Sequence, residues 1–154
     1  MKKIGIIAAI SLMCQLSFAQ DYKTAVGVKG GFPANGSLNL KHDFGKAMGE
    51  FRLGGSGNSF IVQGLYEQNY DLQDGIQWYY GIGASIGSWS GNGYQFNNSY
   101  YAGFYMSVDG VLGLEYTIPD LPINVALDAG PSFVISPLTR LAFGGAVAVR
   151  YILK

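Results

Sequence analysis

Residues that could perform nucleophilic or metal chemistry are few in this chain. Its single histidine, His42, would need a serine and a carboxylate beside it to act as a lipid hydrolase on an outer surface. Ser37 falls on the opposite face of the same extended segment, so the two side chains do not converge locally. No cluster of His, Cys and Asp has metal-ligand spacing, and Gly81-Ile82-Gly83 is not a phosphate-binding loop. The sequence predicts a non-enzymatic protein with no catalytic residues, no cofactor and no metal site.

Charged residues are more informative, because they recur on one face of alternating segments. In 106–118, every second residue from Met106 is apolar or glycine, whereas Asp109 and Glu115 fall in the intervening set. The same alternation places a charged face on the other segments. The predicted charged face comprises Lys29, Lys41, Glu50, Arg52, Glu67, Asp109, Glu115, Asp128 and Arg150. Along 106–118 the opposite face carries no charge, which is typical of a strand with one face toward lipid and one toward a polar interior.

The N-terminus has the pattern of a signal peptide. It combines a basic start at 1–3, an apolar run at 4–12 and a small–x–small triplet at 17–19. The apolar run is too short to span a bilayer, which takes about 20 helical residues. We predict that 1–19 is a signal peptide cleaved after Ala19 and that 20–154 is a single domain. A membrane-anchored N-terminal helix is the alternative, while lipidation of Cys14 is disfavoured because Met13 before it is not small.

The composition also favours an exported protein with one face toward lipid. Cleavage removes the only cysteine, so no disulfide is expected, and it leaves a small acidic excess that argues against nucleic acid as a partner. Charged residues make up 13% of the chain, against about 25% in a typical soluble domain. No segment beyond the signal peptide approaches 18 uninterrupted apolar residues, which excludes a helical membrane protein. Abundant glycine and aromatic residues are typical of a lipid-facing barrel that packs small residues inside.

Eight segments have the alternation of strands, separated by turn signals. The predicted strands are 23–30, 37–44, 50–54, 59–70, 76–89, 101–118, 123–135 and 141–153. Eight is the smallest usual strand number of a transmembrane barrel. We therefore predict an all-β fold, an eight-stranded antiparallel up-and-down transmembrane β-barrel. With the N-terminus in the periplasm, 90–98 becomes a long external loop, and 71–75 and 119–122 become short periplasmic turns.

The charged face of such a barrel points inward, where the lumen is just wide enough for side chains to fill. Buried charges must pair, because an unpaired buried charge is very costly. We expect Arg150 and Arg52 to be the centres, since a guanidinium can hold two carboxylates, and to be the partners of Asp109 and Glu115. A narrow ion path through the same residues is the alternative. The predicted lumen network is Lys29, Arg52, Glu67, Asp109, Glu115, Asp128 and Arg150.

The outer face carries the aromatic residues expected at membrane interfaces. The predicted periplasmic rim contains Trp78, Tyr80, Tyr116 and Tyr151, and the opposite rim contains Phe60, Tyr101 and Phe133. The external loop is the predicted contact surface, through Asn92, Tyr94, Phe96 and Asn97.

Several short motifs carry a family resemblance. They are WYYGIGA at 78–84, VDGVLGLEY at 108–116, GLYE at 64–67, the prolines of 119–122, Leu127-Asp128 and VRY at 149–151. The chain resembles the small outer-membrane β-barrel proteins common in Bacteroidetes. The resemblance covers most of the chain after the signal peptide and implies the general plan of the OmpX and OmpA barrels. Such barrels usually end on an aromatic residue that the insertion machinery reads. Here Leu153 takes the place of that aromatic residue, Tyr151 lies two residues before it, and Lys154 follows it.

These observations predict a monomeric outer-membrane protein with a structural or surface-interaction role. Its expected partners are outer-membrane lipid, the insertion machinery and periplasmic chaperones, and its external ligand is unspecified. A narrow outer-membrane channel is one alternative. A secreted soluble barrel that binds a small apolar ligand, as lipocalins do, is the other, and it requires the charged face to point outward.

Overall fold

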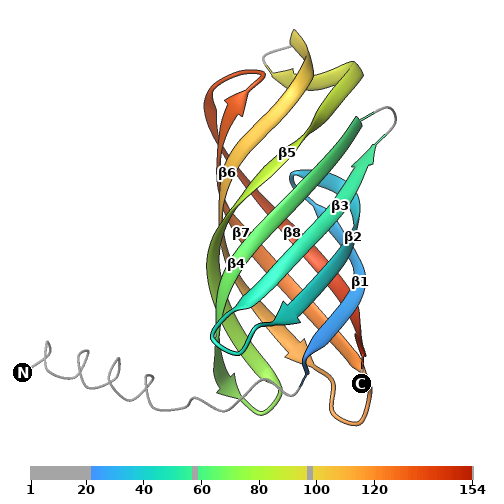
Figure 1. Cartoon of the computed structure of the whole chain (residues 1–154), viewed down its shortest axis with the longest axis vertical. Coiled ribbons are helices and arrows are strands. Elements are labelled where there is room, and N and C mark those ends of the chain that lie inside the picture. Colours follow the sequence, from blue (N-terminus) through green and yellow to red (C-terminus); the bar gives the residue numbers. More distant parts are fainter. Residues whose placement is uncertain (1–21, 57–58, 97–98, 154) are drawn as a thin grey trace, which may run out of the picture.

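The computed structural model describes residues 22–56, 59–96 and 99–153, which form a closed antiparallel barrel (Figure 1). The strands are β1 (Thr24–Gly31), β2 (Ala34–Asp43), β3 (Met48–Ser56), β4 (Ser59–Gln73), β5 (Ile76–Phe96), β6 (Ser99–Thr117), β7 (Ile123–Ser136) and β8 (Arg140–Leu153). Each strand pairs with the next in the chain, which confirms the predicted all-β, eight-stranded, up-and-down barrel. Within the described ranges, no helix is long and apolar enough to cross a membrane.

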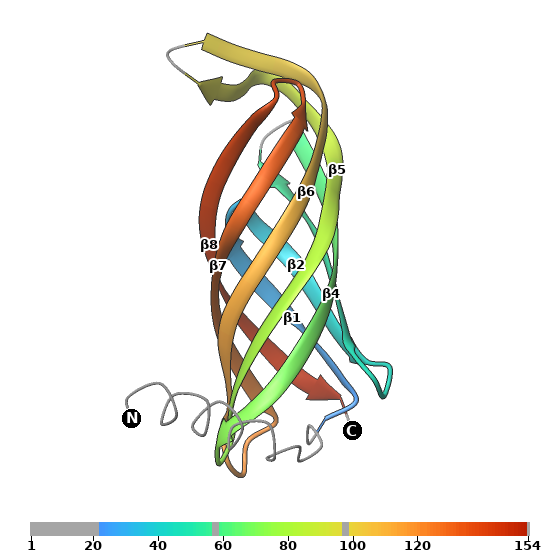
Figure 2. The same ribbon diagram turned by 90° about the vertical axis from the view of Figure 1, so that its left-hand side faces the viewer.

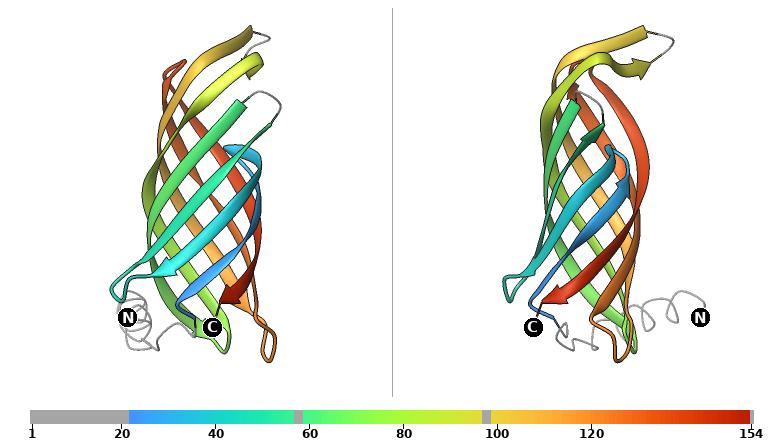
Figure 3. Two further views of the ribbon diagram at one scale, coloured as in Figure 1. Left: turned by 45° about the vertical axis from the view of Figure 1, so that its right-hand side comes forward. Right: turned by 90° about the vertical axis from the view of Figure 1, so that its right-hand side faces the viewer.

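The barrel closes where the first strand meets the last. β1 pairs with β8 from Thr24 opposite Leu153 to Gly31 opposite Ala146. We call the end at which Thr24 meets Leu153 the base and the opposite end the apex. Figures 1 and 3 show all eight strands inclined to the barrel axis, as closure of a sheet into a barrel requires.

Alternating side chains give each strand a buried face and an exposed face. Along β8, Ala146, Ala148 and Arg150 are buried, while Val147 and Val149 between them are exposed. The same alternation runs through the other strands. Every charged residue within the eight strands occupies an inward-facing register position. The predicted distribution of charge between the two faces is therefore confirmed.

The strand bounds differ from the prediction most at the apex. The polar run 90–98 was expected to be a loop, but β5 continues to Phe96 and β6 begins at Ser99. This expectation was wrong because glycine and asparagine dominate the run, while the aromatic residues between them favour strand pairing. Tyr94 pairs with Tyr101 and Phe96 with Ser99 across the hairpin. At the other strand ends the differences are at most three residues, and β3 extends into its flanking glycines.

The β5–β6 hairpin extends beyond the rest of the barrel. β4 accompanies β5 only as far as Ser88, and β7 accompanies β6 only as far as Met106. Beyond these points, no strand among the described residues pairs with either edge of the hairpin. Figures 2 and 3 show the hairpin bending away from the barrel axis at the apex. The bend coincides with an irregular register between Trp89 and Tyr94 and with the positive φ of 130° at Gly103.

Candidate functional site: the charged interior

The interior of the barrel holds the charged face predicted from the sequence. All seven residues of the predicted lumen network are buried, with at most 8% of any residue exposed. Lys41 and Glu50, which were placed on the charged face but not singled out, are buried beside them. The residues come from seven strands, β1 to β4 and β6 to β8, so the fold brings together charges from almost the whole circumference.

Lys29 and Arg150 form one ionic cluster with three carboxylates. Lys29 Nζ lies 2.5 Å from Glu50 Oε1 and 2.5 Å from Asp128 Oδ2. Arg150 Nη2 lies 2.5 Å from Glu50 Oε2, and its Nη1 lies 3.5 Å from Glu115 Oε2. The guanidinium also donates to the side-chain oxygens of two buried asparagines, Asn39 and Asn124. Each cation therefore contacts two carboxylates, as predicted for Arg150, and buried charges of both signs are compensated.

Lys41 forms a second cluster nearer the base. Its Nζ lies 2.9 Å from Glu67 Oε2 and 2.8 Å from Glu115 Oε2. The same ammonium lies 4.0 Å from the centroid of the Tyr79 ring, a cation–π contact. Tyr79 in turn donates its hydroxyl to Asp128 at 2.6 Å. Glu115, shared by Lys41 and Arg150, links the two clusters.

Asp109 is satisfied by neutral donors, within a polar group nearer the apex. It accepts hydrogen bonds from Ser107 Oγ at 2.9 Å and Gln63 Nε2 at 2.8 Å. Ser85 and Ser132 donate their hydroxyls to the same carboxylate. These four donors were not singled out from the sequence, although their inward positions follow from the same alternation as the charges. Hydroxyl and amide donors thus stabilise this buried anion without a cation in contact.

Arg52 departs from its predicted role. It was expected to hold two carboxylates and to pair with Asp109 or Glu115, and this was wrong. Its guanidinium donates to Ser37 Oγ at 3.2 Å, to Gln63 Oε1 at 3.1 Å and to the backbone oxygens of Phe32 and Gly31. The amide of Gln63 therefore bridges Arg52 to Asp109. Alternation places a side chain on the correct face, but the strand stagger decides its height in the barrel, and height selects its partner.

A small cavity lies between the ionic cluster of Lys29 and the polar group of Asp109 and Arg52 nearer the apex. Its volume is about 30 Å³, and its lining includes Lys29, Arg52, Gln63, Asp109 and Asp128. This volume is enough for one or two water molecules, and both donors and acceptors face it.

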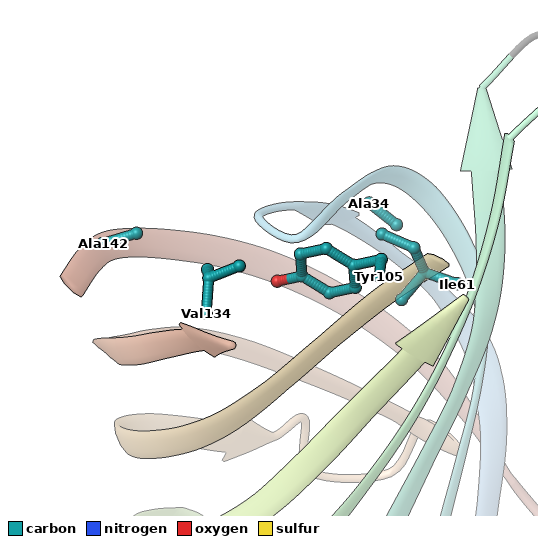
Figure 4. Close-up of a cluster of buried hydrophobic side chains, with 5 residues drawn as sticks. All are labelled: Ala34, Ile61, Tyr105, Val134 and Ala142. Atoms are coloured by element: carbon teal, nitrogen blue, oxygen red, sulfur yellow. The ribbon is translucent and has the colours of Figure 1, made fainter. Parts of the chain in front are cut away.

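Apolar side chains close the interior at both ends. At the apex, Tyr105 packs with Ile61 and Val134, and Figure 4 shows its ring lying between them. Ala34 and Ala142 complete this cluster, which Phe32 and Trp89 flank. Trp89 stacks on Tyr105 with ring centroids 4.7 Å apart. At the base, a second cluster consists of Tyr22, Ala25, Met48 and Ile152.

The residues considered for chemistry do not come together. His42 Nδ1 lies 2.8 Å from Thr24 Oγ1, and the His42 ring meets the Phe44 ring edge-on. Ser37 instead points inward, where its hydroxyl donates to Lys29 O. In the part of the chain that the structure describes, no three His, Cys, Asp or Glu side chains are grouped to hold a metal ion.

The predicted contact surface lies on the protruding hairpin. The backbone positions of Asn92, Tyr94 and Phe96 belong to β5, beyond the last residue that pairs with β4. Asn97 lies outside the described residues. Comparison with protein-family models, with curated proteins and with solved structures gives no match for this chain.

Proposed function

We propose that this chain is a non-enzymatic outer-membrane β-barrel protein with a structural or surface-interaction role. The observation that carries the proposal is the reversed sidedness of the barrel. Charges point inward and large apolar side chains point outward. A protein that folds in water places its apolar residues inside, whereas a barrel surrounded by lipid does the opposite.

The outer wall is apolar around its whole circumference. Each strand contributes at least one large hydrophobic side chain that is 40% or more exposed. One example from each strand is Val28, Leu38, Phe51, Phe60, Ile82, Leu112, Leu127 and Val147. Contiguous apolar patches on soluble monomers rarely exceed a few hundred Å². A continuous belt of this kind supports the lipid of an outer membrane as the surrounding solvent.

Aromatic residues near the base support a membrane interface at that end. Tyr70 and Trp78 stack on the outer wall with ring centroids 5.0 Å apart, and Tyr80 stacks against both. Tyr116 and Tyr151 are also exposed on the outer wall near the base. Amphipathic Tyr and Trp rings at strand ends are typical of the headgroup level. The base would accordingly face the periplasm, as the topology inferred from the sequence has it.

The two alternatives fit the barrel less well. A lipocalin-like protein needs an apolar interior for its ligand, and this interior holds nine charged side chains of the predicted face. A narrow channel needs a continuous path, but ion pairs fill the middle, and apolar clusters lie at both ends. The protruding β5–β6 hairpin supports a surface-interaction role instead, because its unpaired edges extend past the rest of the barrel.

The proposal includes the export signal and the partners that we expect from the sequence. A cleaved signal peptide at 1–19 would deliver the chain to the periplasm, where chaperones and the insertion machinery would receive it. The resemblance to the small Bacteroidetes barrels is part of the proposal, as is the monomeric state.

Fractionation combined with gel mobility tests the proposed location. We expect the protein in the detergent-soluble outer-membrane fraction, and we expect its unheated form to migrate differently from the boiled form. Recovery of the folded protein from the periplasm or the medium without detergent would contradict the membrane assignment. Current steps above background in planar bilayers containing the purified protein would favour the channel instead.

A further inference from the structure

Tyr22 is buried although it precedes the first strand. Only 4% of the residue is exposed, and its ring packs with Ala25, Met48 and Ile152 at the base of the barrel. A tyrosine at the edge of a barrel would ordinarily lie on the outer wall, at the membrane interface. Here the ring lies inside the mouth.

The hydroxyl of Tyr22 reaches the ionic cluster inside the barrel, on the apex side of the mouth. It donates to Glu115 Oε1 at 3.2 Å. Glu115 is the carboxylate that Lys41 and Arg150 share, and it also accepts a hydrogen bond from Asn69 Nδ2 at 3.0 Å. The ring therefore lies between the base and a carboxylate that four side chains contact.

The attachment of Tyr22 allows it to move without loss of the barrel. The next residue, Lys23, is exposed, and its carbonyl oxygen accepts the backbone N–H of Asp43 at 2.8 Å. Strand pairing begins at Thr24, against His42 on one side and Leu153 on the other. Rotation about the backbone of Tyr22 would withdraw the ring and leave the strand pairs intact.

We propose that Tyr22 is a stopper that closes the mouth of the barrel at the base, and that its withdrawal opens the ionic cluster around Glu115 to water and small solutes. The ring excludes solvent through its contacts with Ala25, Met48 and Ile152. The hydrogen bond to Glu115 holds the ring in place. This inference concerns the folded barrel alone and does not depend on the role proposed above.

Thiol labelling of the folded protein in detergent tests the stopper. Cys14 is the only native cysteine, so a Cys14→Ser background that carries Ala126→Cys has a single thiol. Ala126 is 2% exposed and lies opposite Glu115 in the β6–β7 register. Adding Tyr22→Ala should raise the labelling rate of this thiol by a small methanethiosulfonate reagent about tenfold or more, because the reagent no longer waits for local opening.

Two further variants complete the test. Tyr22→Leu keeps apolar packing at the mouth but cannot reach Glu115, so labelling of Ala126→Cys should rise about threefold, even if Tyr22→Ala does not fold. A matched reporter, Ala142→Cys in the apolar cluster at the apex, should label at the same rate whether or not Tyr22 is changed. Labelling of Ala126→Cys that is unchanged by Tyr22→Leu or Tyr22→Ala overturns the proposal. An equal increase at Ala142→Cys also overturns it, because that result would mean general loosening of the barrel.

Discussion

Glu50 contacts two cations at once, and its surroundings show how single residues hold this interior together. One of its oxygens faces Lys29 and the other faces Arg150, each at 2.5 Å. All three side chains are almost completely buried, so bulk solvent does not replace a lost partner. Removal of one charge therefore leaves others buried and undercompensated, a larger cost than the net worth of the pair.

Replacement of Glu50 by glutamine tests this dependence. Glu50→Gln keeps the shape but removes the charge that Lys29 and Arg150 share, and we expect the free energy of unfolding to fall by about 3 kcal/mol. Urea unfolding in detergent micelles, followed by tryptophan fluorescence, measures the change. Asp74→Asn at the exposed β4–β5 turn is the control and should change stability by less than about 0.5 kcal/mol. A similar small effect for both variants would mean that the interior pairs contribute little.

Gly113 provides the space that the Tyr79 ring occupies. The two residues pair across β5 and β6, and a Cβ on Gly113 would lie 2.4 Å from Tyr79 Cζ and 2.7 Å from Asp128 Cβ. Gly113→Ala should therefore lower the free energy of unfolding by about 1–3 kcal/mol through overpacking. The matched control is Gly64→Ala on the outer wall, where an added Cβ meets no atom within 4 Å. Equal stability of the two variants in the same unfolding assay would contradict this account.

At the scale of elements, the unequal strand lengths matter most. β5 and β6 span 21 and 19 residues, whereas β1 spans 8. The excess forms the protruding hairpin, whose unpaired edges offer backbone donors and acceptors to another chain. The barrel below does not need this extension to close.

A shortened hairpin tests whether the contact surface lies on the hairpin or on the rest of the barrel. Replacement of 90–102 by Asn-Gly would place a two-residue turn directly after Trp89 and before Gly103, which face each other in the register. We expect the shortened protein to fold with unchanged heat-modifiable mobility and to behave as a null allele for surface phenotypes. Full complementation of a null strain by a normally folded, shortened protein would exclude the hairpin as the contact surface.

At the scale of the whole molecule, the exposed belt distinguishes lipid from water. Leu112 lies on the outer wall, away from the strand ends, and Leu121 lies in the β6–β7 turn at the base. The two are similarly exposed, at 59% and 52%. In a barrel surrounded by water, arginine would change the stability by a similar amount at the two positions. A barrel in a bilayer would not, because the cost of a charge depends on its depth.

Two arginine variants measure that difference. Leu112→Arg should cost about 2–4 kcal/mol when the protein folds into phospholipid vesicles, and Leu121→Arg should cost about 0–1 kcal/mol. Equilibrium folding into vesicles, read by tryptophan fluorescence, gives both values under the same conditions. Equal costs at the two sites would contradict a transmembrane orientation of the outer wall.

The alternation of side chains along a strand predicts which face of the barrel a residue occupies, but not which partner it contacts. It places Asp109, Glu115 and Arg150 on the inner face, because side-chain direction has a period of two along a strand. Alternation does not predict the height of Arg52 in the barrel, because the stagger of the strands depends on all eight pairings together. It therefore could not show that Arg52 contacts Gln63 and not a carboxylate. Alternation also does not predict a strand at 90–96. A run rich in glycine and asparagine has little strand preference of its own and becomes a strand only when a partner strand lies beside it.

The separation of the ionic partners along the chain has a consequence for how the barrel forms. Lys29 and Glu50 are 21 residues apart, whereas Glu50 and Arg150 are 100 residues apart. The cluster of Lys29, Glu50 and Arg150 is therefore complete only after β8 has joined β1. If the barrel inserts into a bilayer, as proposed above, a partly assembled sheet would expose lone charges to hydrocarbon, so such an intermediate would be penalised at every stage before closure. Insertion would then be a concerted event, with strand closure and formation of these ion pairs in the same kinetic step.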